Sequence, residues 1–180
     1  MITYKHVAFA LLDAGLLTQE RVRAVLDRSA DRLDEHLDPP AVACALEDFG
    51  AAVSVPVDDV GDLVGAYAFL LDRAAALTGG AVTVSDVELR EGEFSSDGVR
   101  DDVLEFAVNG RRVTVDAEHR SDRYVDHLAA TDAVDALAPD DSRTFHYVDF
   151  DGGTGRDTIL VLATPEQART LEDHLGLKLH

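Results

Sequence analysis

The order of apolar and polar positions along the chain changes near residue 80. Before that point apolar residues recur every three or four positions, which is the period of an amphipathic helix. Helices are expected over 3–14, from Thr18 along a stripe that continues to Leu37, from Asp38 to Gly50, and from about 60 to Gly79-Gly80. Thr18 and Asp38 are suited to N-caps, and the proline after Asp38 is suited to a first helical position.

After residue 80 apolar residues alternate with polar ones, as they do in a half-buried strand. Asn109-Gly110 separates two alternating segments within 102–115, and this dipeptide predicts a type I′ hairpin. A two-residue turn then places four apolar residues on one face, with Phe106 opposite Val113 and Leu104 opposite Val115. The strand before this hairpin changes phase at Ser85-Asp86, so a bulge is expected there.

The last sixty residues mix helical and strand patterns. A helix is expected over 121–138, with an interruption near Thr131. Strands over 145–150 and 158–163 are apolar on both faces, which is typical of central strands, and the glycine-rich turn 151–157 joins them. The run Thr164-Pro165-Glu166-Gln167 is a capping box, and Gly176 ends the helix that it begins.

These elements predict an α+β protein in which an N-terminal helical layer is followed by a mainly antiparallel sheet with flanking helices. Residues 1–80 form the helical region, and residues 81–180 form a mixed region of hairpins and helices. A chain of 180 residues with 46% hydrophobic residues can bury a substantial core, so the two regions are expected to pack as one compact unit.

The charge of the chain limits the class of its partners. It carries 35 acidic and 16 basic residues, a net charge of −19, and both regions are acidic. Such a field repels nucleic acids and anionic membranes and attracts basic protein surfaces. The same acidity is typical of a salt-adapted regulatory or housekeeping domain, so that alternative stays open. The first residues do not form a secretory signal, and cytoplasmic residence is expected.

The stretch FHYVDFDGGTG, residues 145–155, is the main candidate for chemistry. A calcium loop would need oxygen ligands where Gly153 and Leu160 stand, so a hairpin turn without metal or cofactor is expected. His146 alternates onto an apolar face, which favours a core or interface histidine. The alternative is a small hydrolase-type enzyme that uses His146 with Asp149 or Asp151. The single cysteine, Cys44, lies in an apolar run and is expected to be buried.

The last forty residues carry a resemblance. Their order of strand, acidic turn, strand and capped helix, seen in FHYVDFDGGTGRDTILVLATPEQARTLEDHLG, resembles the ends of small acidic bacterial immunity proteins that neutralise secreted toxins. The resemblance implies a cytoplasmic, non-catalytic protein that occludes a basic toxin. Complementary charge raises association rates, which agrees with that role. The partner-binding residues are then expected to be Asp140, Asp141, His146, Asp149, Asp151 and Asp157.

Overall fold

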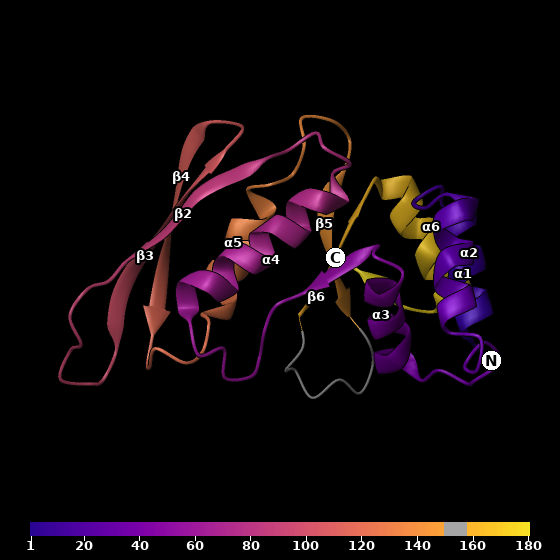
Figure 1. The fold of residues 1–180 in the computed structure, drawn as a ribbon, viewed down its shortest axis with the longest axis horizontal. Coiled ribbons are helices and arrows are strands. Elements are labelled where there is room, and N and C mark those ends of the chain that lie inside the picture. The colour runs from indigo at the N-terminus through magenta and orange to yellow at the C-terminus, as the bar shows by residue number, and fades with distance from the viewer. Residues whose placement is uncertain (150–157) are drawn as a thin grey trace. The chain divides into compact units, whose positions relative to one another are not determined.

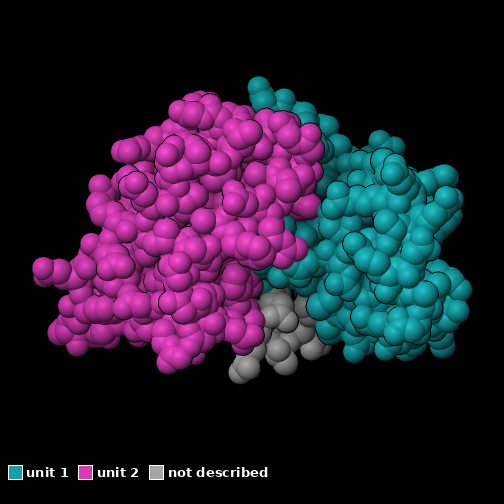
Figure 2. Space-filling model, in the orientation of Figure 1, with its two compact units in different colours: residues 1–54, 140–180 teal, residues 55–139 magenta. Residues whose placement is uncertain are grey.

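The computed structural model describes residues 1–149 and 158–180, and its chain divides into two compact units. Unit 1 comprises residues 1–54 and 140–180, and unit 2 comprises residues 55–139 (Figure 2). The change of pattern near residue 80 falls inside unit 2. The expected α+β class is confirmed, with helices at the N-terminus and two antiparallel sheets after them (Figure 1). None of the described helices has the length and apolar character that a membrane span requires.

The helices of unit 1 begin where capping residues place them. They are α1 (Tyr4–Asp13), α2 (Gln19–Arg28), α3 (Pro39–Asp48) and α6 (Pro165–Leu175). Thr18 accepts a hydrogen bond from the Arg21 N–H, and Asp38 accepts one from the Ala41 N–H. The capping box at Thr164 and Gln167 is present in full, and Gly176 ends α6 at φ +66°.

The sheet of unit 1 has four strands in the order β1-β6-β5-β7. Their bounds are β1 (Ala52–Ser54), β5 (Thr144–Asp149), β6 (Ile159–Ala163) and β7 (Lys178–Leu179). The two strands with apolar residues on both faces, β5 and β6, are the central pair, as the sequence predicts. They pair antiparallel from Thr144 opposite Ala163 to Tyr147 opposite Leu160. All five residues of β6 are buried, and Ile159, Val161 and Ala163 join the core formed with the helices of this unit.

Unit 2 is a three-stranded sheet with two helices. Its elements are α4 (Leu63–Leu77), β2 (Val84–Arg90), β3 (Arg100–Val108), β4 (Arg111–His119) and α5 (His127–Asp135), and the strand order is β2-β3-β4. Both helices lie on one side of the sheet (Figure 1). On that side Leu104 and Phe106 are buried, whereas the other face carries mostly polar side chains.

The hairpin of β3 and β4 has the predicted register. Phe106 lies opposite Val113 and Leu104 opposite Val115, and Asn109 and Gly110 have φ of 49° and 78° as a type I′ turn requires. The expected bulge in β2 is also present, since the register shifts between Ser85 and Glu88.

Three details differ from the sequence prediction. Helix α2 ends at Arg28 instead of continuing toward Leu37, whose N–H bonds to the Ile2 carbonyl. Helix α5 begins only at His127 and continues through Thr131, whose hydroxyl is accommodated by a hydrogen bond to the His127 carbonyl. The prediction that Cys44 is buried is wrong: it lies on the exposed side of α3.

Candidate functional site

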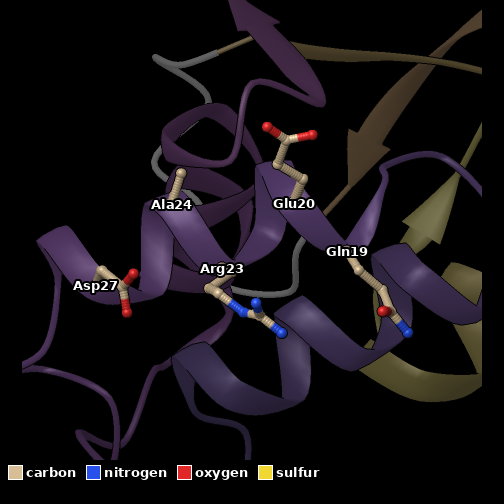
Figure 3. A pocket seen from close by; sticks show the side chains of 5 residues that line it. All are labelled: Gln19, Glu20, Arg23, Ala24 and Asp27. Atoms are coloured by element: carbon tan, nitrogen blue, oxygen red, sulfur yellow. The ribbon is translucent and has the colours of Figure 1, made fainter.

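Two surface depressions are candidate sites. One, of about 440 Å³, lies along α2 and is lined by Gln19, Glu20, Arg23, Ala24 and Asp27 (Figure 3). Its residues come from a single helix, and its basic residue stands between two acidic ones in sequence. Two acids and one base on a single helix face do not form a specific ion site.

The other depression, in unit 2, is lined by carboxylates and is called here the acidic pocket. It measures about 490 Å³ and lies between β3, β4 and the first turns of α5. Its acidic residues are Asp101, Asp102, Asp116, Glu118, Asp126 and Asp132, and its apolar residues are Val103, Ala117, Leu128 and Ala129. None of these described lining residues is basic. The pocket therefore presents negative charge beside apolar surface.

Four of the six carboxylates are open to solvent: Asp101, Asp116, Glu118 and Asp132. None of the four forms an ion pair with another residue in the described part of the chain. Asp101 lies directly opposite Glu118 across β3 and β4, so the two like charges face each other on the open side of the sheet. Like charges in this position destabilise a sheet. This pair therefore costs folding free energy that a bound cation would offset.

Asp126 is fixed at the mouth of the pocket by two backbone donors. As the N-cap of α5 it accepts the Leu128 N–H at 2.9 Å, and its second oxygen accepts the Glu118 N–H at 2.8 Å. The first bond orders the start of the helix, and the second ties that start to β4. Leu128, the next residue but one, is left 78% exposed beside this carboxylate.

Asp102 is the innermost carboxylate, and its side chain is fully enclosed. It accepts hydrogen bonds from His119 Nδ1 at 2.7 Å, from Arg100 Nε at 2.8 Å and from the Gly92 N–H at 2.9 Å. Burial alone would raise the pKa of Asp102. The bonds from Arg100, Gly92 and His119 outweigh burial and hold this pKa below its usual value, so the carboxyl stays ionised.

A buried chain of hydrogen bonds joins Asp102 to Asp126. His119 Nε2 lies 2.9 Å from the Tyr67 hydroxyl, and the Tyr67 oxygen accepts the Asp126 N–H at 2.9 Å. Because a carboxylate only accepts, His119 donates from Nδ1 to Asp102. The Tyr67 oxygen already accepts the Asp126 N–H, and its O–H donates to His119 Nε2. Burial raises the pKa of Tyr67, so its hydroxyl keeps the proton that this chain needs.

Arg100 closes the network on the other side of Asp102. Its side chain is 5% exposed, its Nη1 lies 2.7 Å from Asp122 and 3.5 Å from Glu91, and its guanidinium stacks 4.9 Å from the centre of the Phe94 ring. Only Arg100 Nη2 lacks a hydrogen-bond partner among the described buried side-chain atoms. The loops 91–99 and 120–126 are thereby held to the base of β3.

The chemistry of this network is structural. Tyr67 and His119 are fully enclosed, so neither can meet a substrate, although Asp, His and a hydroxyl stand in the order found in nucleophilic enzymes. The network instead fixes Asp126 at the acidic pocket and the enclosed Asp102 carboxylate in the interior behind it. Tyr67 and His119 are therefore positioning residues for Asp102 and Asp126.

The residues expected to bind a partner from the sequence lie in unit 1. Asp140 and Asp141 are exposed, and Asp141 is bound by the Arg143 guanidinium, whose hydrogen bonds lower the pKa of this carboxyl. Asp149 is exposed and its carboxylate lies 3.6 Å from His180 Nε2. Asp151 and Asp157 lie outside the described residues.

The hydrolase alternative requires His146 to act together with Asp149 or Asp151. His146 Nε2 lies 3.2 Å from the Ala163 carbonyl oxygen and 3.2 Å from the Thr144 hydroxyl, which fixes its ring to the neighbouring strand. No hydrogen bond or ion pair joins His146 to Asp149 in the described structure, and Asp151 is outside it. Among the described residues no group of His, Cys, Asp and Glu is arranged to hold a metal ion.

Asp102, His119 and Tyr67 were not predicted from the sequence as a connected set. A signal was present in the hairpin pattern, because Asp102 and His119 occupy the positions that point with Leu104 and Phe106 toward the core. A charged residue in a core register requires a buried partner. Tyr67 could not be identified as that partner because it comes from a helix more than thirty residues earlier.

The chain was compared with protein-family models, with curated proteins and with solved structures. It matches no family model, no curated protein and no solved structure. Its function must accordingly be argued from the site itself.

Proposed function

We propose that this protein is a non-catalytic acidic binding module of the immunity type, and that its acidic pocket receives basic side chains of a protein partner. The observation that carries the proposal is the Asp101–Glu118 pair, two facing carboxylates without a described cation. An Arg or Lys side chain of a partner placed between them would relieve this repulsion and form ion pairs to both.

The apolar part of the pocket fits the same ligand. Leu128 is largely exposed, and Val103 and Ala129 also line the depression. Long basic side chains bury an aliphatic stem along apolar surface while the charged head meets polar groups. A pocket with carboxylates around apolar residues therefore suits Arg or Lys better than it suits a small inorganic cation.

The net charge of −19 supports the proposal through kinetics. A field of one sign steers a basic partner toward the protein and raises the association rate in a salt-dependent way. A basic toxin is the partner that the resemblance to immunity proteins implies. The acids Asp140, Asp149, Asp151 and Asp157 of unit 1 contribute to this field in the proposal, while the pocket supplies the contacts.

Two variants with equal loss of charge test the proposal. The pocket variant carries Asp101→Asn, Asp116→Asn, Glu118→Gln and Asp132→Asn, and the loop variant carries Asp140→Asn, Asp149→Asn, Asp151→Asn and Asp157→Asn. The probe is a fluorescent acetylated hexa-arginine peptide, followed by anisotropy at low and high salt. Four exposed ion pairs contribute enough for the pocket variant to bind about tenfold more weakly, with a smaller loss for the loop variant.

The comparison separates the proposal from its rivals because both variants have the same net charge. Equal losses of affinity would mean that the peptide senses bulk charge, as expected of a salt-adapted domain. A larger loss in the loop variant would place binding at the acids of unit 1 that the sequence singled out. The immunity role has its own test: a toxin encoded by a neighbouring gene should lose activity at an equimolar ratio, and the pocket variant should protect less.

A further inference from the structure

The edges of the two sheets are protected to different degrees. An exposed strand edge is a template for pairing with another chain, and proteins shorten, bulge or charge their edges to prevent it. In unit 1 the described edge strands β1 and β7 have three and two residues. In unit 2 the edge strand β2 contains the bulge at Ser85, with Asp86 at φ 55°. Strand β4 differs, because all nine of its residues pair with β3 in an unbroken register.

The register shows which backbone groups of β4 point away from the sheet. In a two-residue hairpin Val108 and Arg111 exchange both backbone bonds, so the odd-numbered residues of β4 face β3 and the even-numbered residues face outward. The bond from the Glu118 N–H to Asp126 agrees, because this outward donor is met by a side chain instead of a strand. Arg112, Thr114 and Asp116 are the remaining outward-facing residues of β4.

We propose that β4 pairs antiparallel with β4 of a second copy of this chain, with the two-fold axis at Thr114. In this arrangement Thr114 faces its own counterpart, and Arg112 of each copy faces Asp116 of the other. The three outward-facing residues of one strand thus meet the three of the second copy, and each facing pair exchanges two backbone hydrogen bonds. The two sheets of unit 2 become one continuous sheet.

Charge complementarity selects this register. Asp116 has no ion pair within the described residues, and Arg112 is 76% exposed with only Glu105 nearby, at 3.6 Å. Pairing about Thr114 therefore brings each of these charges to an opposite one, twice by symmetry. The two neighbouring registers are less favourable. In one, Arg112 lies opposite Glu118, whose N–H already bonds to Asp126. In the other, Arg112 lies opposite Thr114, which carries no charge.

The other face of the strand is compatible with the same pairing. Val113 and Val115 are only half-buried at the edge of the sheet, and in the proposed register Val113 of one copy lies opposite Val115 of the other. Their pairing would remove apolar surface from water. This inference goes beyond the proposed function and concerns the protein without its partner; because both use Asp116, a basic side chain bound there would compete with the dimer.

The first test uses sedimentation equilibrium on the full chain up to high micromolar concentration. The wild type should form a dimer. Thr114→Pro removes the outward N–H that the pairing needs, while the bonds to β3 come from odd-numbered residues and are kept. Its dimer dissociation constant should rise by about tenfold or more. Thr114→Val keeps the N–H and should dimerise like the wild type, and circular dichroism checks that both variants fold.

Charge reversal tests the register. Arg112→Asp alone and Asp116→Arg alone should each weaken the dimer, because like charges then face each other. An equimolar mixture of these two variants should form a mixed dimer, since each supplies the charge that the other lacks, and the double variant should pair with itself. A monomeric wild type would overturn the proposal. Single reversals that leave the dimer unchanged, or a mixture that does not associate, would overturn the β4 register.

Discussion

His119 Nδ1 lies 2.7 Å from Asp102 Oδ2, and both side chains are completely enclosed by unit 2. Through Tyr67 this pair is joined to Asp126, so buried side chains of the unit help to set the position of a carboxylate at the acidic pocket. The network also holds Arg100, which has three carboxylates around it. The contribution of this network to folding stability, and the positions of its protons, can be measured on the protein without any partner.

Replacing Asp102 should destabilise unit 2 strongly. Asp102→Asn keeps the shape of the side chain but removes the charge that Arg100 requires, and its amide group would face donors from His119 or Arg100. Breaking a buried ion pair from one side costs about 3–5 kcal/mol of unfolding free energy. Urea denaturation followed by circular dichroism measures the loss.

The neighbouring residue supplies the control for this experiment. Asp101→Asn removes the same charge one position earlier, on the exposed face opposite Glu118. Because it relieves a repulsion and breaks no described ion pair, it should change the unfolding free energy by no more than about 0.5 kcal/mol. A similar loss in both variants would show that the buried network contributes little beyond the general effect of removing an acid.

The low pKa of Asp102 predicts a dependence of stability on pH. Since the pKa of this carboxyl is lower in the folded than in the unfolded protein, the unfolded state binds the proton more readily. The stabilisation is fully present above the ordinary pKa of aspartate, about 4, and is lost as the pH falls through the folded value. The wild type should therefore lose more stability than Asp102→Asn between neutral pH and pH values below about 4.

Two exposed aspartates also contribute to the acid sensitivity of both proteins. The Arg123 and Arg143 guanidinium groups lower the pKa values of Asp59 and Asp141, so Asp102→Asn should retain part of its acid sensitivity. The measured quantity is the difference between the two pH profiles. Parallel profiles would contradict a lowered pKa for Asp102.

Gly110→Val should destabilise the hairpin through its backbone conformation alone. Gly110 has φ +78°, and no atom lies within 4 Å of the place where a Cβ would stand, so steric conflict is absent. The left-handed region costs a residue with a side chain about 1–2 kcal/mol of conformational free energy, and the cost is greatest for β-branched residues. Asparagine tolerates this region, so Gly110→Asn should lower the thermal midpoint much less. An unchanged midpoint for valine would contradict the type I′ turn.

The hairpin shows what local pattern can determine. Asn109-Gly110 and the alternation beside it carry enough information to give the register, because the turn type and the buried face specify the same pairing. The caps at Thr18, Asp38 and Thr164 are local in the same way. The apolar residues on both faces of β5 and β6 likewise predicted that these strands are central in their sheet.

The acidic pocket could not be predicted in this way because its parts are separated along the chain. Asp101 and Glu118 belong to the predicted hairpin, but Asp126 and Asp132 come from α5, whose start the sequence analysis placed too early. The short strand β1 was missed because three residues show no period. It is stabilised by pairing with β6, which lies more than a hundred residues later.

No specific divalent metal site is expected in the protein. Although the chain is acidic, the carboxylates of the pocket are spread over two strands and a helix, and the described residues contain no ligand cluster. Calorimetric titration with zinc, manganese and calcium should give only weak, non-saturating heats. A saturable one-site isotherm that is lost in His146→Ala or Asp149→Ala would favour the hydrolase alternative.

The protonation of His119 gives the most direct test of the buried network. The donors and acceptors around the ring are all satisfied only when Nδ1 carries the proton and Nε2 accepts from Tyr67, because the Tyr67 oxygen already receives the Asp126 N–H. Long-range proton–nitrogen NMR should therefore place the ring proton of His119 on Nδ1, toward Asp102, and not on Nε2. Tyr67→Phe removes the hydroxyl and leaves both His119 Nε2 and the Asp126 N–H without a partner, at a cost of about 1–3 kcal/mol. Phe69→Leu, two residues later on the exposed side of α4, is the matched control and should change stability little. A ring protonated at Nε2 in the wild type, or a Tyr67→Phe variant as stable as its control, would show that this chain of hydrogen bonds does not hold Asp102 and Asp126 in place.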